Sequence, residues 1–411
     1  MNRTRLNRRA FLGAGLLFAG GLAMPQFASW AEEAPPGLTI EKIDIWPVRY
    51  PTVMRFRFFE GPVSSDGRPA VIIRITASDG TVGWGESVPI PRWSYETLEG
   101  ATAAIENYLR PVILGMNPFD LQGIHEAMNR EIAAGYTVGY PITKAGIDLA
   151  LHDLIGKVTG RNISELWGRP ASGRLTLSWT LNPSTLDDVD GLIEAGRARG
   201  FEHFNVKVAP DLETDLALCR MVKEQVPDGF LWADANGHYD LSTALEAAPK
   251  LADIGVPVLE QPVRQNLITG LQALKKQGAL PIILDEGVVT PADLLQYIKL
   301  GCCDGMAMKP ARCGGLVSGV QQVEILETSG LMFLGSGLTD PDISLAASLI
   351  LYKAFGLEYP AALNGPQFLG FSVLDEPFTV EGGSVPVPTG PGLGISVNVD
   401  KVEELAAQSR A

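Results

Sequence analysis

Five charged residues recur along the middle of the chain at nearly constant intervals. They are Lys207, Asp234, Glu260, Asp285 and Lys309, and successive members are 27, 26, 25 and 24 residues apart. Each follows a short apolar run, and the interval corresponds to one strand followed by one helix. If these runs are parallel strands of a barrel, residues at this phase converge on the mouth formed by the C-terminal ends of the strands.

Three consecutive carboxylates flanked by two lysines would suit metal-assisted proton abstraction. A hard divalent cation prefers negatively charged oxygen ligands. A lysine buried beside a cation has a lowered pKa and can act as a base near neutral pH. An acidic residue at a strand end can instead cap a helix, and a single lysine there can be a solvated rim charge. Five such residues in phase favour a functional site over these alternatives.

The elements that must position these residues form two predicted domains. Residues 38–160 show alternating apolar residues and then helical periodicity, which predicts an N-terminal α+β capping domain. Residues 161–365 alternate short apolar runs with helix-length segments, which predicts a (β/α)8 barrel of the α/β class. The first apolar run is LTLSWT, from residue 175. Residues 366–411 contain no further unit, and we expect them to pack back on the capping domain.

The composition excludes several classes of protein. The chain has 411 residues, of which 46% are hydrophobic and 19% charged, so we expect a well-packed soluble protein rather than a disordered one. The formal net charge of −14 leaves no broad basic face, which argues against a nucleic-acid partner. Four cysteines are too few for a disulfide scaffold.

Residues 1–31 are predicted to be an export signal. Arg8 and Arg9 lie in a basic start without acidic residues, and an apolar stretch of about 15 residues follows. The sequence Arg-Arg-Ala-Phe-Leu resembles a twin-arginine signal, and a Sec signal or an N-terminal anchor is the alternative. The apolar stretch is shorter than the roughly 20 residues that a membrane-spanning helix needs. We therefore expect a periplasmic protein with no membrane span after the signal is removed.

Six motifs resemble those of the enolase superfamily, in particular the mandelate racemase/muconate lactonizing enzyme family. They are GWGE (83–86), AGIDLALHDLIGK (145–157), DANG (234–237), LEQP (259–262), LDEG (284–287) and KPARCGG (309–315). The resemblance covers nearly all of residues 38–400, and it implies a modified TIM barrel with a capping domain in a homo-oligomer. It also implies one Mg²⁺ per subunit, replaceable by Mn²⁺, bound by Asp234, Glu260 and Asp285. The cation would hold a substrate carboxylate while a lysine removes the α-proton, which gives an enediolate.

The lysines indicate the muconate-lactonizing-like branch of the family. The mandelate-racemase-like branch pairs a His on the seventh strand with an Asp on the sixth, whereas here the sixth strand carries Lys309 and no His follows His238. Lys207 and Lys309 would then face opposite sides of the substrate α-carbon, as racemisation or epimerisation requires. A dehydratase or cycloisomerase with one working lysine is an alternative. A non-catalytic periplasmic carboxylate-binding protein is a further one.

Two departures from the branch bear on the site. The branch usually has Lys-x-Lys on the second strand, but this chain has Asn205 in place of the first lysine, so a hydrogen-bond donor remains without its charge. Dipeptide epimerases of the branch carry Asp-x-Asp on the eighth strand. The corresponding residues 362–366 read Ala-Leu-Asn-Gly-Pro, which argues against a standard dipeptide epimerase.

The expected substrate contacts come from the barrel mouth and from two covering loops near residues 53–66 and 87–95. They are Asn205, Asn236, Phe56, Trp93, Tyr95 and Asp340. The aromatic residues could enclose a quaternary ammonium group by cation–π attraction, or they could simply pack in the core and rim. Asp340 could receive a cationic group of the substrate or cap the next helix. We expect a small carboxylate substrate, with an amino-acid or betaine derivative as one possibility.

Overall fold

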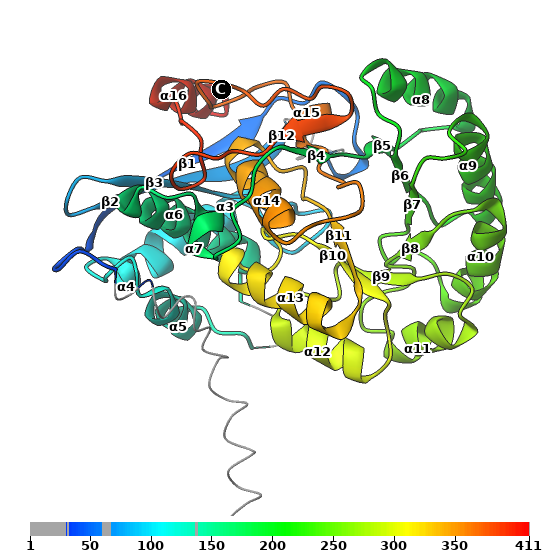
Figure 1. Cartoon of the computed structure of the whole chain (residues 1–411), viewed down its shortest axis with the longest axis horizontal. Helices are drawn as coiled ribbons and strands as arrows, with labels where there is room; N and C mark the ends of the chain where they lie inside the picture. The colour runs from blue at the N-terminus through cyan, green and yellow to red at the C-terminus, as the bar shows by residue number, and fades with distance from the viewer. Residues whose placement is uncertain (1–29, 31–32, 60–66, 136–138, 411) are drawn as a thin grey trace, which may run out of the picture.

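The computed structural model describes residues 30, 33–59, 67–135 and 139–410, and it shows a sheet-and-helix domain beside a barrel (Figure 1). The predicted export signal, apart from Trp30, lies outside the described residues, as does the end of the first covering loop. Within the described part of the chain, no helix combines the length and the apolar character needed to cross a membrane.

The N-terminal domain is a three-stranded antiparallel sheet with helices against it. Strands β1 (Ile40–Tyr50), β2 (Arg68–Ala77) and β3 (Val82–Ser87) pair in this order, and β2 is buried along most of its length. The helical elements are α3 (Leu98–Ala104), the π-helical turn η2 (Ile105–Leu109), α4 (Arg110–Ile113), α5 (Leu121–Glu131), α6 (Pro141–Thr159) and α7 (Ile163–Leu166). This arrangement agrees with the α+β capping domain that the sequence predicts.

Seven parallel strands form the curled barrel sheet, in chain order. They are β5 (Trp179–Leu181), β6 (Phe204–Lys207), β7 (Leu231–Asp234), β8 (Val258–Glu260), β9 (Ile282–Leu284), β10 (Gly305–Met308) and β11 (Met332–Gly335). Residues 361–362 take the eighth position through single bridges to Leu177 and Ser336. The described residues therefore close the barrel with a short bridging segment in place of a full eighth strand, and the predicted (β/α)8-type architecture is confirmed.

Helices on the outside of the barrel connect each strand to the next (Figure 1). They are α8 (Val189–Ala198), preceded by the 3-10 turn η3 (Leu186–Asp188), α9 (Leu212–Gln225), α10 (Leu241–Ile254), α11 (Ile268–Gln277), α12 (Pro291–Lys299), α13 (Leu316–Ser329) and α14 (Asp342–Ala354). Several begin at a capping side chain. Asp211 accepts a hydrogen bond from the Thr214 amide at 2.9 Å, and Asp240 accepts one from the Thr243 amide at 2.8 Å. Each cap satisfies an amide that has no partner within its helix.

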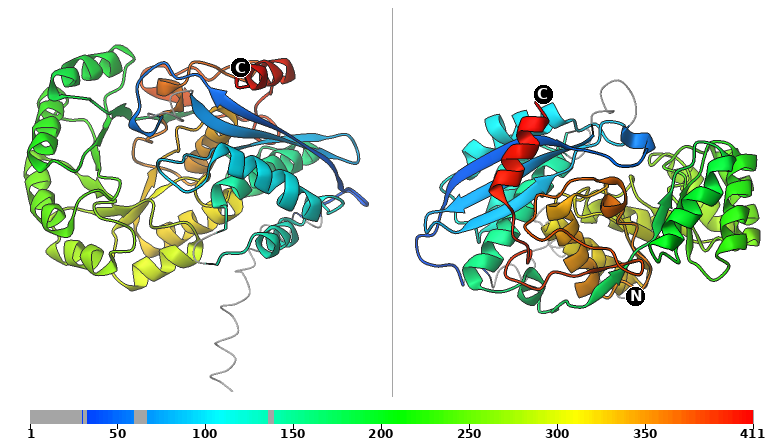
Figure 2. Two further views of the ribbon diagram at one scale, coloured as in Figure 1. Left: turned by 180° about the vertical axis from the view of Figure 1, so that it is seen from behind. Right: turned by 90° about the horizontal axis from the view of Figure 1, so that it is seen from above.

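The run LTLSWT is divided between two sheets, although the sequence predicts a single barrel strand there. Strand β4 (Arg174–Thr176) pairs antiparallel with β12 (Ser384–Pro386), and only β5 enters the barrel sheet. The C-terminal segment, which also contains α15 (Gly365–Phe368), ends in α16 (Val399–Gln408). Figure 2 shows α16 lying along the N-terminal sheet, where the Arg49 amide donates to Ser409 Oγ at 2.7 Å.

Helix α6 joins the two domains because it packs on β3 and also contacts α13 and α14. A glycine makes the close approach possible: a Cβ on Gly85 would lie 2.0 Å from the Gly146 carbonyl oxygen. Buried Asp153 on the same helix accepts hydrogen bonds from the Trp84 amide at 2.8 Å and the Leu393 amide at 2.9 Å. The GWGE and AGIDLALHDLIGK motifs therefore interlock within the cap, and α6 connects them to the barrel helices α13 and α14.

The substitution Gly85→Ala should lower the free energy of unfolding by about 3 kcal/mol, because the added methyl group would overlap a backbone carbonyl in a packed contact. Gly191→Ala in α8 is the matched control. Nothing lies within 4 Å of its added Cβ, and alanine is favoured over glycine in a helix by roughly 0.5–1 kcal/mol. Urea unfolding followed by circular dichroism would measure both changes. Equal stability of the two variants would contradict the close packing of β3 on α6.

Candidate active site

The five charged residues predicted to converge do lie together at the C-terminal mouth of the barrel. Strand register places Lys207 beside Asp234, and Asp234 beside Glu260, on the neighbouring strands β6, β7 and β8. Asp285 and Lys309 directly follow β9 and β10. All are buried except Lys207, which is partly buried.

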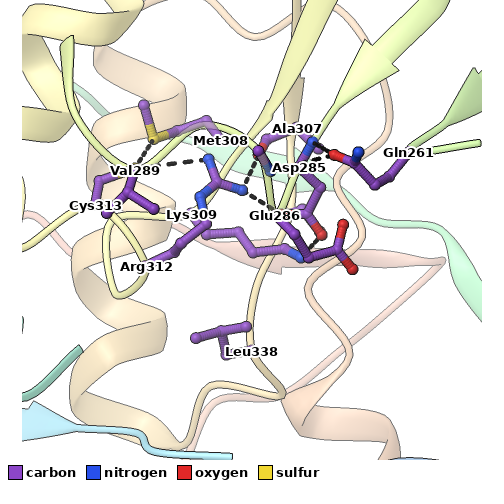
Figure 3. A network of polar contacts seen from close by, with 12 residues as sticks. Gln261, Asp285, Glu286, Val289, Ala307, Met308, Lys309, Arg312, Cys313 and Leu338 are labelled. Atoms are coloured by element: carbon purple, nitrogen blue, oxygen red, sulfur yellow. Dashed lines mark hydrogen bonds and ion pairs between the residues drawn. The ribbon is translucent and has the colours of Figure 1, made fainter. Parts of the chain in front are cut away.

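Each lysine forms an ion pair with a different carboxylate. The ammonium group of Lys207 pairs with Asp234 Oδ2, and that of Lys309 pairs with Asp285 Oδ2. The second oxygen of Asp285 pairs with the buried guanidinium of Arg312, which also donates to the carbonyl oxygen of Ala307 at 2.8 Å (Figure 3). The two lysines thus approach the row of three carboxylates from its two flanks.

Glu260 lies in the middle of the row and has the least compensated charge. Burial and the carboxylates of Asp234 and Asp285 hold the pKa of Glu260 well above its ordinary value. Its Oε1 atom is buried and has no hydrogen-bond partner among the described residues.

Burial also raises the pKa of Asp234, but Lys207 and Lys309 outweigh this effect, so the pKa of Asp234 is lowered overall. Burial lowers the pKa of Lys309, but the carboxylates that it faces raise it overall.

The donor set of the three carboxylates fits a hard divalent cation. It supplies oxygen ligands, one buried oxygen without a partner, and a mutual repulsion that a positive charge would relieve. Across residues 33–59, 67–135 and 139–410, no group of three or more Asp, Glu, His or Cys side chains is gathered as the ligands of a metal ion are. Amino and guanidinium groups instead form ion pairs with the oxygens of Asp234 and Asp285. A cation would therefore compete with these groups.

A pocket of about 380 Å³ adjoins the charged cluster. Lys207 and Lys309 both line it, together with Asn205 and Asn236. Its apolar wall is formed by Phe56, Phe58, Ile90, Trp93, Leu338 and Ala362. Among the described residues, no Asp or Glu side chain lines this pocket. The pocket therefore offers amines and amides to an acid group, and apolar surface to the rest of a ligand.

Both covering loops of the cap reach the pocket. In the first loop, which contains the 3-10 turn η1 (Arg57–Phe59), the ring centroid of Phe56 lies 4.5 Å from that of Phe368. In the second loop, the ring centroid of Trp93 lies 4.7 Å from Lys309 Nζ. Tyr95 does not line the pocket, and 53% of its surface is exposed. The structure thus brings two of the three expected aromatic residues to the site.

Asn236 connects the first covering loop to the carboxylate row. Its side-chain oxygen accepts a hydrogen bond from Arg57 at 2.9 Å, and its side-chain nitrogen donates to Glu286 Oε1 at 3.0 Å. Its backbone amide donates to Asp234 Oδ1 at 2.8 Å, from a left-handed conformation with φ of 45° that asparagine tolerates better than most residues. One residue therefore contacts the cap, the barrel mouth and a carboxylate of the cluster.

Asp340 and Asn205 differ in their access to the pocket. Asp340 is buried and does not line the pocket: its carboxylate accepts hydrogen bonds from the Leu338 amide at 3.3 Å and the Ser348 hydroxyl at 3.4 Å, and it is attracted by Arg68. Asn205 does line the pocket, and both polar atoms of its side chain are buried without a partner among the described residues. Asn205 can therefore contact a ligand directly, whereas Asp340 is engaged within the fold.

Two residues of the site, Arg312 and Glu286, are missed by the sequence analysis. Burial and the charges of Asp285 and Asp234 raise the pKa of Glu286 to about 7. Both residues lie within motifs already noted, KPARCGG and LDEG, next to residues assigned a role. Their proximity to Lys309 and Asp285 in the chain was the signal that could have identified them.

Comparisons with known proteins match both domains. Residues 189–402 match the family model "Enolase C-terminal domain-like", and residues 44–168 match "Mandelate racemase / muconate lactonizing enzyme, N-terminal domain". Muconate cycloisomerase 1 of Rhodococcus opacus is 29% identical over 89% of this chain and 98% of its own length. N-succinyl-L-Arg/Lys racemase of Bacillus cereus is 25% identical over 90% of this chain and 98% of its own length. A crystal structure of muconate lactonizing enzyme from Pseudomonas fluorescens, complexed with muconolactone, has a TM-score of 0.83 and 25% identity, covering 90% of this chain and 99% of that one.

The substitution Arg312→Met should lower the free energy of unfolding by about 3–5 kcal/mol, because removing one partner of a buried pair leaves the charge of Asp285 undercompensated. Adding Asp285→Asn to this variant should recover part of the loss. Urea unfolding in the presence of EDTA would measure both. Lys250→Met, which removes the exposed pair with Glu246, is the control and should change stability little. A loss at Arg312 no larger than that at Lys250 would contradict a structural role for the buried pair.

Proposed function

Because this chain belongs to the mandelate racemase/muconate lactonizing enzyme family of the enolase superfamily, we propose that it is a Mg²⁺-dependent racemase or epimerase acting at the carbon α to a carboxylate. One observation carries the proposal: Lys207 and Lys309 line the same pocket while each pairs with a different carboxylate. A proton removed by one lysine can then be returned by the other to the opposite face of the α-carbon.

We assign the cation to Asp234, Glu260 and Asp285, whose donor oxygens suit Mg²⁺. When bound, it would hold the substrate carboxylate and stabilise the negative charge that develops there as the α-proton leaves. Side chains of the protein transfer the proton and exclude water. Lys207 and Lys309 accept and return the proton at Nζ, while the covering loops shield the pocket from water.

The lining of the pocket narrows the class of substrate. A free ammonium group would be buried without a carboxylate partner, since no described Asp or Glu side chain lines the pocket. An acylated nitrogen avoids this cost, and a quaternary nitrogen could instead face the rings of Phe56 and Phe58. We therefore propose an N-acylated amino acid or a betaine. The relative named N-succinyl-L-Arg/Lys racemase supports the first of these.

A cycloisomerase is the second candidate. It is supported by the relative named muconate cycloisomerase 1 and by the solved muconate lactonizing enzyme. Such an enzyme, like a dehydratase, needs one working lysine, so the pair of lysines in the pocket favours the racemase without requiring it. A periplasmic location is also part of the proposal, and it rests on the sequence of residues 1–31.

Separate Lys207→Ala and Lys309→Ala variants test the reaction. Each should lose α-proton exchange from one enantiomer by at least about 100-fold while retaining exchange from the other, because each lysine serves one face. Proton NMR in D₂O with Mg²⁺ would measure this for both enantiomers of N-acetyl amino acids and of proline betaine. Loss of turnover of cis,cis-muconate in one variant alone would favour the cycloisomerase. Absence of exchange or turnover with a broad panel of acids would favour a carboxylate-binding protein.

The assignment of the cation predicts that Glu260→Gln weakens Mg²⁺ binding by at least about 10-fold, because an anionic ligand is lost from the centre of the row. Isothermal titration calorimetry of the protein after EDTA treatment would measure the affinity. The same change should stabilise the metal-free protein against urea, since the buried carboxyl group is repelled by its neighbours. Glu246→Gln on α10 is the control. Unchanged Mg²⁺ affinity in Glu260→Gln would contradict the assignment.

A further inference from the structure

Arg68 is a buried arginine between the cap and the barrel, outside the catalytic pocket. It is the first residue of β2, and its relative exposure is 0%. It does not line the pocket. A guanidinium group is costly to bury unless its N–H groups find acceptors and its charge is offset. The groups around Arg68 therefore indicate what this side chain does.

The guanidinium group donates to carbonyl oxygens on two segments that belong to different domains. On the cap, Nη1 donates to the Pro89 carbonyl oxygen and Nη2 to the Val88 carbonyl oxygen, each at 2.8 Å. On the barrel, Nη2 and Nε donate to the Leu338 carbonyl oxygen at 2.8 and 3.0 Å, and Nε also donates to that of Thr339 at 3.3 Å. The donors of a guanidinium group form a rigid planar fork, so one side chain holds both segments in a fixed relation.

Both segments lead directly to walls of the catalytic pocket. On the cap side, residues 88–89 precede Ile90, which lines the pocket together with Trp93. The Ile90 carbonyl oxygen accepts a hydrogen bond from the Trp93 amide at 3.1 Å, so the two residues are joined in one turn. The Trp93 ring in turn lies 4.7 Å from Lys309 Nζ. On the barrel side, Leu338 itself lines the pocket.

The surroundings of Arg68 keep it charged and connect it to the first covering loop as well. Burial lowers the pKa of Arg68 to about 10, while the attraction of Asp340 and Glu86 opposes this change, so the group is cationic at neutral pH. The guanidinium carbon lies 5.7 Å from the ring centroid of Phe59, in the first covering loop. One side chain therefore contacts both covering loops and the barrel.

We propose that Arg68 is a positioning residue of the active site, which holds the second covering loop against the loop after β11 and so fixes two walls of the catalytic pocket. The inference deepens the proposed function and rests on it for the kinetic test alone. Because Arg68 acts through carbonyl groups and not on the ligand, it should affect the alignment of the reacting groups more than ligand binding. A misplacement of about 1 Å can lower a rate about 100-fold.

Hydrogen–deuterium exchange followed by mass spectrometry tests this contact without reference to any reaction. In Arg68→Lys, amide exchange should be at least about 10-fold faster in peptides that cover residues 87–97 and 336–341, because lysine keeps the charge but lacks the fork that spans the two segments. Peptides of α10 and α11 should exchange as in the wild-type protein. Arg74→Lys is the matched control, since Arg74 lies on the same strand and pairs with Asp44 at 2.7 Å.

The kinetic test compares the two lysines in the Mg²⁺-loaded protein, with both enantiomers of an N-acetyl amino acid that the wild-type protein exchanges. The Lys309→Ala variant identifies the enantiomer that depends on Lys309. In Arg68→Lys, kcat for α-proton exchange of that enantiomer should fall at least about 10-fold, and that of the other enantiomer less, because Trp93 lies against Lys309. KM should change less than about 3-fold. A loss of folded protein alone would lower both values of kcat equally.

Asp340→Asn keeps the test decisive if Arg68→Lys does not fold. The amide retains the shape of the side chain and an acceptor oxygen, but it removes one of the two charges that attract Arg68. Amide exchange should then be about 3-fold faster in the same two segments. Thermal unfolding of each variant checks that the fold is intact.

The outcomes separate this inference from the proposed function. Faster amide exchange confined to the two segments, with the unequal loss of kcat, would support the role of Arg68. Unchanged amide exchange there, or equal acceleration throughout the chain, would overturn it whatever reaction the protein catalyses. Loosened segments with a wild-type kcat would also overturn the positioning role. Loosened segments in a protein that exchanges no α-proton would support the contact and contradict the racemase.

Discussion

The repulsion between three buried carboxylates is the constraint on which this site depends. Strand register places Asp234 and Glu260 side by side, and Asp285 follows on the next strand. Burying such charges is costly unless cations are close. The chain meets this cost with Lys207 and Lys309 from the flanking strands and with the guanidinium that follows β10. Of the three carboxylates, Glu260 forms no ion pair among the described residues, and its neighbours hold its pKa well above the ordinary value, so a divalent cation would relieve the repulsion most there.

The capping domain matters because the barrel mouth alone would leave this cluster open to water. Phe56 and Trp93 from the two covering loops complete the pocket, and Trp93 lies directly against the ammonium of Lys309. Their positions depend on how firmly the cap is attached. Helix α6 provides this attachment, because β3 packs closely on it at Gly85 and the helix itself contacts α13 and α14 of the barrel. Motifs far from the chemistry thus position the walls of the site.

The sequence was sufficient to predict the barrel and the convergence of the five charged residues, because both depend on a repeated strand–helix unit. It was sufficient for the family resemblance because six short motifs carry it. It could not predict features that depend on distant pairing. The run LTLSWT splits because β4 pairs with β12, and the barrel closes through residues 361–362, which form single bridges. The hydrogen bond from Arg57 to Asn236 and the engagement of Asp340 within the fold likewise depend on how loops close over the mouth. No local pattern encodes these contacts.

The distribution of charge around the barrel mouth differs from that of the whole chain. A formal net charge of −14 disfavours the approach of an anion over most of the surface. Beside the pocket, however, the guanidinium groups of Arg92 and Arg264 have no partner among the described residues. The pocket itself is lined by two lysines and by no described acidic side chain. The carboxylates of Asp234 and Asp285 pair with lysine and arginine side chains, and together with Glu260 they would face the proposed metal. The local field at the mouth therefore opposes that of the whole chain.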